Sequence, residues 1–343
     1  MNYWQVAAGE GARDYSSVFL QYGVMLIGAG DPGPYFQNKG YYAGHRGWRA
    51  QVVAFAERVA REDIVILKRP HHRQWQIQAV GRVTGDYEYV EQFDDVEGWN
   101  LQHCRRVEWV YPLKVQDDAE KREKILVEGL SMGTFKRLYK GEVIEKSDRL
   151  LEEGEKQIPE QIPTPAAKIS DEDLVERLIG NGLRPAAAET VIQTIWQVRR
   201  LARCYAHHGQ DLSEHETRTF LITPVLLAIG WSEQKIKIEW KNIDMAFFWE
   251  AYKRGAEPHM ILESKRMGEG LRYAERQAER YAKLYPRCLR LVVSDGIRYR
   301  LYRKEGAKWI WKAYMNLLKL KDHHPYEAHM DGAPDLFVSL MPK

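Results

Sequence analysis

The chain has 343 residues, of which 44% are apolar and 29% charged, and its formal net charge is +3. This length allows two domains, and the composition is typical of a globular protein with a sizeable core. The three cysteines, Cys104, Cys204 and Cys288, fit no metal-ligand spacing and leave one unpaired, which excludes a disulfide-built secreted fold and favours a cytoplasmic location. The apolar run 18–30 is too short and too interrupted to span a membrane or to act as a signal peptide.

Residues 1–112 are rich in aromatic residues, glycine and short β-type runs. The runs at 24–27, 64–67 and 75–80 are bounded by turn residues and predict strands, and an apolar stripe at 49–61 predicts one helix. We therefore expect a small, mostly β domain here, a barrel covered by one or two helices.

Residues 113–210 predict a connector. The segment 113–169 is charged and shows no strand pattern, and the three prolines of 156–168 indicate a linker. Ser170 and the three acidic residues after it are typical of a helix start, and we expect two helices, at 171–180 and 184–207.

Residues 211–343 predict an α/β domain with a central mixed sheet, which makes the whole chain a multidomain α+β or α/β protein. We expect helices at 213–229 and 271–284, an Asp295-Gly296 turn, a loop at 331–335, and strands at 236–240, 244–249, 260–264, 289–294 and 298–302.

Asp244, Glu263 and Lys265 form the sharpest pattern in this domain. Residues two apart in a strand point to the same face, so Glu263 and Lys265 project together, and Asp244 on a neighbouring strand can bring a second carboxylate beside them. Two carboxylates, with a backbone carbonyl and waters, suit Mg²⁺, and the lysine can orient or deprotonate an attacking water. A Glu-x-Lys pair is common at solvated strand ends, but the run 260–262 before it is typical of a buried strand.

Two further residues share one face of the helix expected at 271–284. Gln277 and Tyr281 are four positions apart, so both can reach toward the end of the sheet. From Arg254 to Lys312 the chain carries 15 Lys/Arg against 7 Asp/Glu, and we expect this basic segment to contact a phosphate backbone.

The segments ETRTFLITPVLLAIGW, IDMAFF, PHMILESKR, QAERY and VVSDGIRYRLY occur in this order within residues 211–305. Together they resemble the N-terminal nuclease domain of type I restriction enzyme R subunits, a branch of the PD-(D/E)xK nuclease superfamily. R subunits continue into a helicase motor, whereas this chain has no GxxxxGK[ST] phosphate loop, so we expect no use of ATP.

The resemblance implies a role for six residues. It implies Asp244 and Glu263 as ligands of Mg²⁺, with Mn²⁺ as a substitute, and Lys265 as the catalytic lysine. Gln277 and Tyr281 match the family's QxxxY helix, which supports the active site. Glu214 matches a glutamate of the family's first helix, and Glu216 is the alternative for that position.

Aromatic residues gather in the N-terminal region, which holds 5 of 11 tryptophans and 9 of 19 tyrosines. Trp75 and Trp109 are most simply packing residues. Eight others lie near turns or strand ends, where an aromatic ring can line a pocket: Trp4, Tyr35, Tyr41, Tyr42, Trp48, Tyr87, Tyr89 and Trp99.

The segments 3–4, 62–65, 79–89 and 103–109 resemble EVE-like members of the PUA/YTH-type barrels. That resemblance implies a flipped, modified base held in an aromatic cage, for which we select Trp4, Tyr35, Trp48 and Tyr87. Ala29 stands where relatives often have a tryptophan, so the cage residues of the family do not transfer directly.

Taken together, the sequence predicts a Mg²⁺-dependent endonuclease that restricts foreign DNA carrying modified bases, in the manner of a type IV system. Its partner would be double-stranded DNA, and a double-strand break implies two copies, hence a homodimer formed through the helices at 171–207. The alternatives are an RNA-directed nuclease with a PUA-like barrel and a non-catalytic nucleic-acid-binding protein of a defence system.

Overall fold

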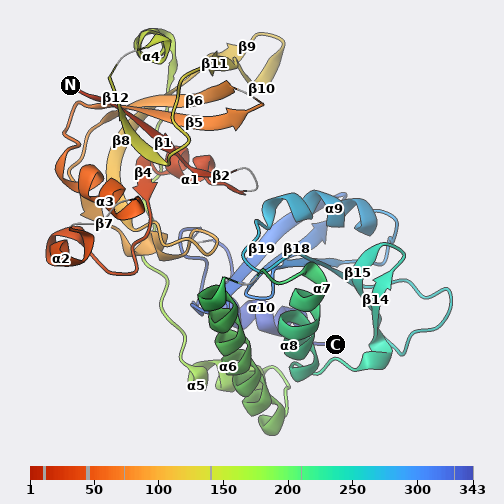
Figure 1. The fold of residues 1–343 in the computed structure, drawn as a ribbon. Coiled ribbons are helices and arrows are strands. Elements are labelled where there is room, and N and C mark those ends of the chain that lie inside the picture. Colours follow the sequence, from red (N-terminus) through yellow and green to blue (C-terminus); the bar gives the residue numbers. More distant parts are fainter. Residues whose placement is uncertain are drawn as a thin grey trace. The chain divides into compact units, whose positions relative to one another are not determined.

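The computed structural model describes residues 1–10, 13–43, 47–72, 74–139, 141–209, 211–327 and 329–342. The chain divides into two compact units, Met1–Pro163 (unit 1) and Thr164–Lys343 (unit 2), and each combines helices with a sheet (Figure 1). The fold is therefore a multidomain α+β fold. Within the described residues, no helix combines the length and the apolar character that crossing a membrane requires.

Unit 1 is built on a curled nine-stranded sheet with the main order β12-β1-β5-β6-β8-β13, to which β4, β7 and β11 add. Its strands are β1 (Tyr3–Ala7), β4 (Val24–Ile27), β5 (Ile64–His71), β6 (Gln74–Val83), β7 (Glu88–Tyr89), β8 (His103–Tyr111), β11 (Ile125–Val127), β12 (Phe135–Leu138) and β13 (Glu155–Lys156), with small hairpins at β2 (Gly9–Glu10), β3 (Arg13–Asp14), β9 (Lys114–Val115) and β10 (Asp118–Arg122). Its helices are α1 (Ser16–Gln21), α2 (Lys39–Tyr42), α3 (Trp48–Glu57) and α4 (Glu142–Glu153).

The curl of this sheet comes from two long strands that change partners along their length. The first half of β6 pairs with β11 and its second half with β8, while β8 passes from β4 and β7 to β6 and β13. Helix α4 packs Val143 and Leu150 against Ile64 and Ile66 of β5. The predicted barrel-like β domain with covering helices agrees with this half-closed sheet.

The structure divides the chain differently from the three regions that the sequence suggests. Strands β9 to β13 and helix α4 belong to unit 1, although 113–169 was expected to lack strands. These strands are short, and all but β11 carry charged residues, so they show little alternation. Strands β11, β12 and β13 pair with β6, β1 and β8, whereas β9 and β10 pair with each other. The irregular stretch 157–167 spans the boundary between the units, as the prolines predict.

Unit 2 is built on a six-stranded sheet in the order β14-β15-β16-β17-β18-β19, antiparallel except for the parallel pair β16 and β17. Its strands are β14 (Ile236–Trp240), β15 (Ile243–Phe247), β16 (Met260–Ser264), β17 (Arg290–Ser294), β18 (Arg298–Glu305) and β19 (Lys308–Asn316). Its helices are α5 (Asp171–Gly180), α6 (Pro185–His208), α7 (Glu214–Thr217), α8 (Thr223–Ala228), α9 (Arg272–Ala282) and α10 (Ala333–Leu340).

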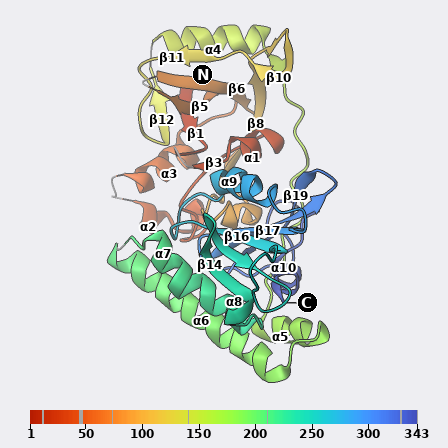
Figure 2. The ribbon, with the colours of Figure 1, turned by 90° about the vertical axis from the view of Figure 1, so that its right-hand side faces the viewer.

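Both faces of this sheet are covered, as Figure 2 shows. Helix α9 joins β16 to β17 and packs Ala274 and Ala278 against Ile261 and Val293. On the opposite face, α6, α8 and α10 pack against the side chains that alternate with these, such as Leu262. Successive side chains of a strand point to opposite faces of the sheet, and here both faces are buried. The core therefore has two layers, one on each side of the sheet.

The sequence predicts unit 2 closely, since α5, β14 and β16 have the expected bounds. Two expectations were incomplete. Strand β19 was not predicted, and Ala333–Leu340 forms α10 after a short loop. The Asp295-Gly296 turn is confirmed, and Gly296 has a φ of 83° and a Cβ position 2.6 Å from Leu221 Cβ, so the turn requires glycine.

Candidate active site

Asp244 and Glu263 face each other on neighbouring strands. Met245 pairs with Leu262 in the antiparallel register of β15 and β16, and one step further along this register Asp244 lies opposite Glu263. Both side chains belong to the face that α9 covers, because Ala246 and Ile261 of the same alternation pack there. A two-residue hairpin, with Lys241 and Asn242 at positive φ, fixes where β15 begins.

Glu263 is a carboxylate in an unusual environment. It is 1% exposed, and its Oε2 has no hydrogen-bond partner among the described residues. Burial and the negative charge of Asp244 raise its pKa to about 7, although Lys265 acts in the opposite direction. A buried, partly unsatisfied carboxylate beside a second carboxylate is costly without a cation, and such groups cluster at functional sites.

Asp244 is held on both of its oxygens. Oδ2 accepts hydrogen bonds from the backbone N–H of Ser264, at 2.7 Å, and from its hydroxyl, at 2.8 Å. Oδ1 accepts one from Arg218 at 2.9 Å. These contacts fix the carboxylate at the end of β16, next to Glu263.

Lys265 completes the predicted trio. Its Nζ lies 3.1 Å from Glu263 Oε1 and 3.8 Å from Glu214 Oε2, and its backbone N–H donates to Ser294 O of β17 at 2.8 Å. Burial lowers the pKa of this lysine, but the surrounding carboxylates outweigh burial and the net pKa is raised. The ammonium is therefore protonated at neutral pH and donates hydrogen bonds rather than accepting a proton.

The structure distinguishes the two registers considered for the glutamate of the first helix. Glu214 is the residue beside Lys265, and burial raises its pKa. Glu216 instead accepts hydrogen bonds from the backbone N–H and the hydroxyl of Ser213, forming a capping box at the start of α7.

Arg218 is the most important residue that sequence reasoning missed. It is 4% exposed and bridges Asp244 to Glu239, at 2.9 and 2.8 Å. It begins a π-helical turn, a distortion found frequently at functional sites. The four-residue spacing from Glu214 places both on one helix face, and this spacing could have indicated the arginine.

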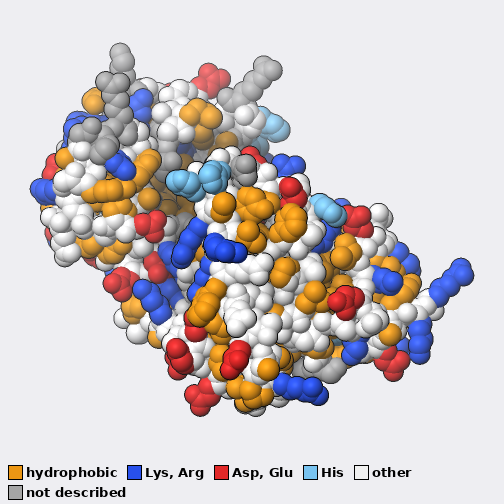
Figure 3. Space-filling model, turned by 60° about the horizontal axis from the view of Figure 1, so that its bottom comes forward, with side chains coloured by type: hydrophobic (Ala, Val, Ile, Leu, Met, Phe, Trp, Pro, Cys, Tyr) orange, Lys and Arg blue, Asp and Glu red, His pale blue; other side chains and the backbone are white. Residues whose placement is uncertain are grey.

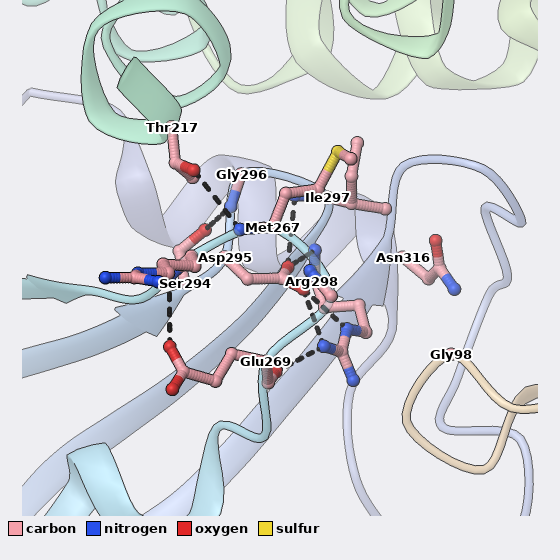
Figure 4. Close-up of polar contacts among 12 residues, drawn as sticks. Gly98, Thr217, Met267, Glu269, Ser294, Asp295, Gly296, Ile297, Arg298 and Asn316 are labelled. Atoms are coloured by element: carbon pink, nitrogen blue, oxygen red, sulfur yellow. Dashed lines mark hydrogen bonds and ion pairs between the residues drawn. The ribbon is translucent and has the colours of Figure 1, made fainter. Parts of the chain in front are cut away.

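A second polar network holds the loop that follows Lys265 (Figure 4). The Asp295 carboxylate accepts from the guanidinium of Arg298, which also donates to Glu269 O at 2.6 Å, and from Gly268 N at 3.0 Å. Met267 N donates to Thr217 Oγ1 of α7 at 3.2 Å. The turn between β17 and β18 and helix α7 therefore fix this loop from two sides.

Gln277 and Tyr281 lie half-buried on α9, over the same face of the sheet as Glu263. Tyr281 packs against the apolar cluster formed by the alanines of α9. The hydrogen bonds of Asp244 and Glu263 come from Arg218, Ser264 and Lys265. A supporting role for the two α9 residues stays a prediction.

The basic segment 254–312 divides between interior and surface. Arg290, Arg298 and Arg300 are 8%, 3% and 6% exposed and have internal partners, so they are not available to a phosphate backbone. Arg276 and Arg280 of α9 are exposed. On the face drawn in Figure 3, basic and acidic side chains are interspersed with hydrophobic ones. The expected contact of this segment with a phosphate backbone is therefore wrong for the buried arginines and stays a prediction for the exposed ones.

The carboxylate oxygens of Glu263 and its neighbour Asp244 suit a hard divalent cation. Two carboxylates lie side by side, one of them with a buried oxygen that lacks a partner among the described residues, and oxygen ligands of this kind suit Mg²⁺. Within the described part of the chain, no group of three or more His, Cys, Asp or Glu side chains has metal-binding geometry. A cation here would take its remaining ligands from backbone or water.

Unit 1 contains a separate cavity of about 340 Å³. Its wall is mainly apolar and includes Trp48, Trp99 and Phe19, the amide residues Gln51 and Asn100, and residues 26–29. Trp48 is 41% exposed, and Arg13 lies over the ring of Trp99 at 5.4 Å.

The four residues selected for an aromatic cage do not line this cavity together. Trp48 does, but Trp4 is 2% exposed, stacks on Phe135 and donates to Asp63, because its position in β1 points into the core. Tyr35 and Tyr87 belong to a hydrogen-bonded aromatic cluster, in which the Tyr87 hydroxyl bonds to His103 and accepts from Tyr35 N. Trp99 and Phe19 supply the other rings.

Residues 4–139 match a family model described as Domain of unknown function (DUF8426). The match begins in β1 and ends one residue after β12, so it spans the whole wall of the cavity and most of the sheet in unit 1. Its description assigns no function. No curated protein matches the chain. The extent of the match agrees with the structural placement of β9 to β12 in unit 1.

Proposed function

We propose that the chain is a Mg²⁺-dependent endonuclease that hydrolyses DNA phosphodiesters, with a PD-(D/E)xK active site in unit 2. The single observation that carries this proposal is the pair Asp244 and Glu263, side by side on β15 and β16, with the Lys265 ammonium 3.1 Å from Glu263. Sheet order, helix α9 and the buried carboxylate oxygen of Glu263 agree with such a site.

In this proposal Asp244 and Glu263 would hold Mg²⁺, which would neutralise charge on the scissile phosphate when bound. Lys265 keeps its proton and orients the attacking water through hydrogen bonds. Glu214 holds Lys265 from its other side at 3.8 Å. Arg218 fixes Asp244 and offsets its charge, so it acts as a positioning residue.

Exposed cations on helix α9 support a polyanionic substrate. Arg276 and Arg280 lie four residues apart on the outer side of α9, the helix that covers the face bearing Glu263. Guanidinium groups at this spacing share a helix face and can bind successive phosphates. Binding should therefore weaken as salt increases.

Unit 1 would supply target choice as an EVE/PUA-like reader of a modified base. Its 340 Å³ cavity has the size of a small-ligand pocket, and tryptophans with neighbouring amide groups suit stacking on a base and hydrogen bonding to its edge. Trp48, Trp99 and Gln51 would contact the base. Foreign DNA with modified bases would be the substrate to restrict.

The purified protein should cleave modified duplex DNA with Mg²⁺ and not with EDTA, and Asp244→Ala should remove this cleavage. The assay compares unmodified, cytosine-modified and adenine-modified duplexes and a structured RNA. Cleavage of RNA alone would favour the RNA-directed alternative. Binding without cleavage under every condition would leave a nucleic-acid-binding protein and overturn the catalytic proposal.

Trp48→Ala should weaken binding of a modified duplex about 5- to 150-fold, because stacking on one aromatic ring contributes about 1–3 kcal/mol. The partly exposed side chain can be removed with little effect on folding. Fluorescence anisotropy with matched modified and unmodified duplexes measures the change. Tyr139→Ala, at an exposed position outside the cavity, is the control. Equal affinities of the wild type for both duplexes would exclude the reader.

A further inference from the structure

One face of α6 is exposed and continuous. The residues of this stripe are spaced alternately by four and three positions, which keeps them within about 40° of one line along the helix; they are Glu189, Gln193, Trp196, Arg200, Arg203 and His207. The opposite face packs Val191, Ile195 and Val198 into the core. Trp196 is 55% exposed, which is unusual for a tryptophan in the middle of a long helix.

The first half of the stripe borders a groove between α5 and α6 with a volume of about 710 Å³. Apolar side chains, Val175, Ile179 and Ile192, form its floor together with Trp196. Four carboxylates line it: Asp171, Glu172, Glu176 and Glu189. The indole N–H of Trp196 donates to Asp171 Oδ2 at 2.8 Å, which holds the ring in place at one end of the groove.

The second half of the stripe has the opposite charge. After Trp196 the exposed residues of the stripe are Arg200, Arg203 and His207, none of which lines the groove. Helix α6 extends beyond α5 in this part (Figure 2). The same helix therefore presents an acidic apolar groove at its beginning and a basic ridge at its end. A surface with this pattern is complementary to itself when two copies run antiparallel.

We propose that a second copy of this chain occupies the groove, with the two α6 helices antiparallel and Trp196 of each copy at the two-fold axis. In that register Arg203 of one copy meets Glu189 of the other, and Arg200 lies beside Gln193. The two indoles cover each other and the apolar floor is shielded from water. The evidence for this interface is the charge and the exposure of side chains on α5 and α6. The interface is therefore independent of the Mg²⁺ site proposed at Asp244 and Glu263.

Reciprocal charge swaps test this interface by sedimentation velocity over a range of concentrations. Arg203→Glu and Glu189→Arg should each weaken the dimer about tenfold or more, because each places like charges opposite one another, and the double variant should restore it. Added salt should also weaken the wild-type dimer. Glu145→Arg, an exposed charge reversal on α4, is the matched control and should dimerise like the wild type. A wild type that is monomeric throughout, or a double variant no better than the singles, would overturn the proposal.

Cross-linking tests the register. In a Cys204→Ser background, which removes the exposed native thiol, Gln193→Cys should form a disulfide with Arg200→Cys of another copy when the two proteins are mixed. Each variant cross-linking only with itself would indicate parallel helices and contradict the antiparallel register. Asp244→Ala protein should dimerise normally, so a failed nuclease assay and a failed interface are distinguishable.

Discussion

Lys265→Ala should slow Mg²⁺-dependent DNA cleavage by about 10²- to 10³-fold, the effect of removing one preorganised donor from a transition state. The Lys265 side chain is 16% exposed, and the neighbouring carboxylates keep its ammonium charged and in place. Because it is a donor at neutral pH, its loss should lower kcat more than it changes the affinity for DNA. Single-turnover rates and equilibrium binding measured on the same duplex separate these two effects.

The matched control is Lys253→Ala, which removes the same charge from a side chain that is 80% exposed. It should cleave like the wild type. Thermal unfolding of both variants checks that Lys265→Ala remains folded, since removing the lysine leaves Glu263 without its cationic neighbour. If a folded Lys265→Ala protein cleaved at the wild-type rate, Lys265 would have no part in the chemistry.

The core trio could be predicted from sequence because local alternation determines it. The run 260–262 indicates a buried strand, and the period of two then places Glu263 and Lys265 on one face. Pairing of β15 with β16 also follows from their order along the chain. The same reasoning could have placed Trp4 in the core, since Trp4 and Val6 both point inward from β1, but its position near a strand end suggested a pocket instead.

The rest of the site depends on contacts between residues far apart in sequence. Arg218 contacts Asp244 across 26 positions, and Asp295 contacts Gly268 across 27. Helix spacing can place Arg218 on the same face as Glu214, but no local periodicity encodes its contact with Asp244 or the contact of Asp295 with Gly268. The cavity of unit 1 likewise combines side chains from α1, α3 and the loop around Trp99. Strands such as β11 and β12 are too short for their pattern to identify them, and they form because neighbouring strands offer hydrogen-bonding partners.

Glu263→Gln should stabilise the protein in EDTA at pH 8 and remove the stabilisation that Mg²⁺ gives the wild type. The folded protein raises the pKa of Glu263 from 4.5 to about 7, so the folded state binds this proton more tightly than the unfolded state. Stability should therefore decline as the pH rises from about 4.5 through 7, and above that the folded state carries a penalty of about 3 kcal/mol. A neutral amide carries no such charge.

Mg²⁺ acts on the same carboxylate in the opposite direction, because it favours the ionised form. At 100 times its dissociation constant it should stabilise the wild type by about 2.7 kcal/mol. Thermal and urea unfolding at pH 5 and pH 8, with EDTA or Mg²⁺, measure both effects without any substrate. Glu216→Gln is the matched control, since glutamine also forms a capping box, and it should respond to Mg²⁺ like the wild type. Equal Mg²⁺ stabilisation of Glu263→Gln and the wild type would place the cation away from Glu263, and the endonuclease proposal would lose the carboxylate on which it chiefly depends.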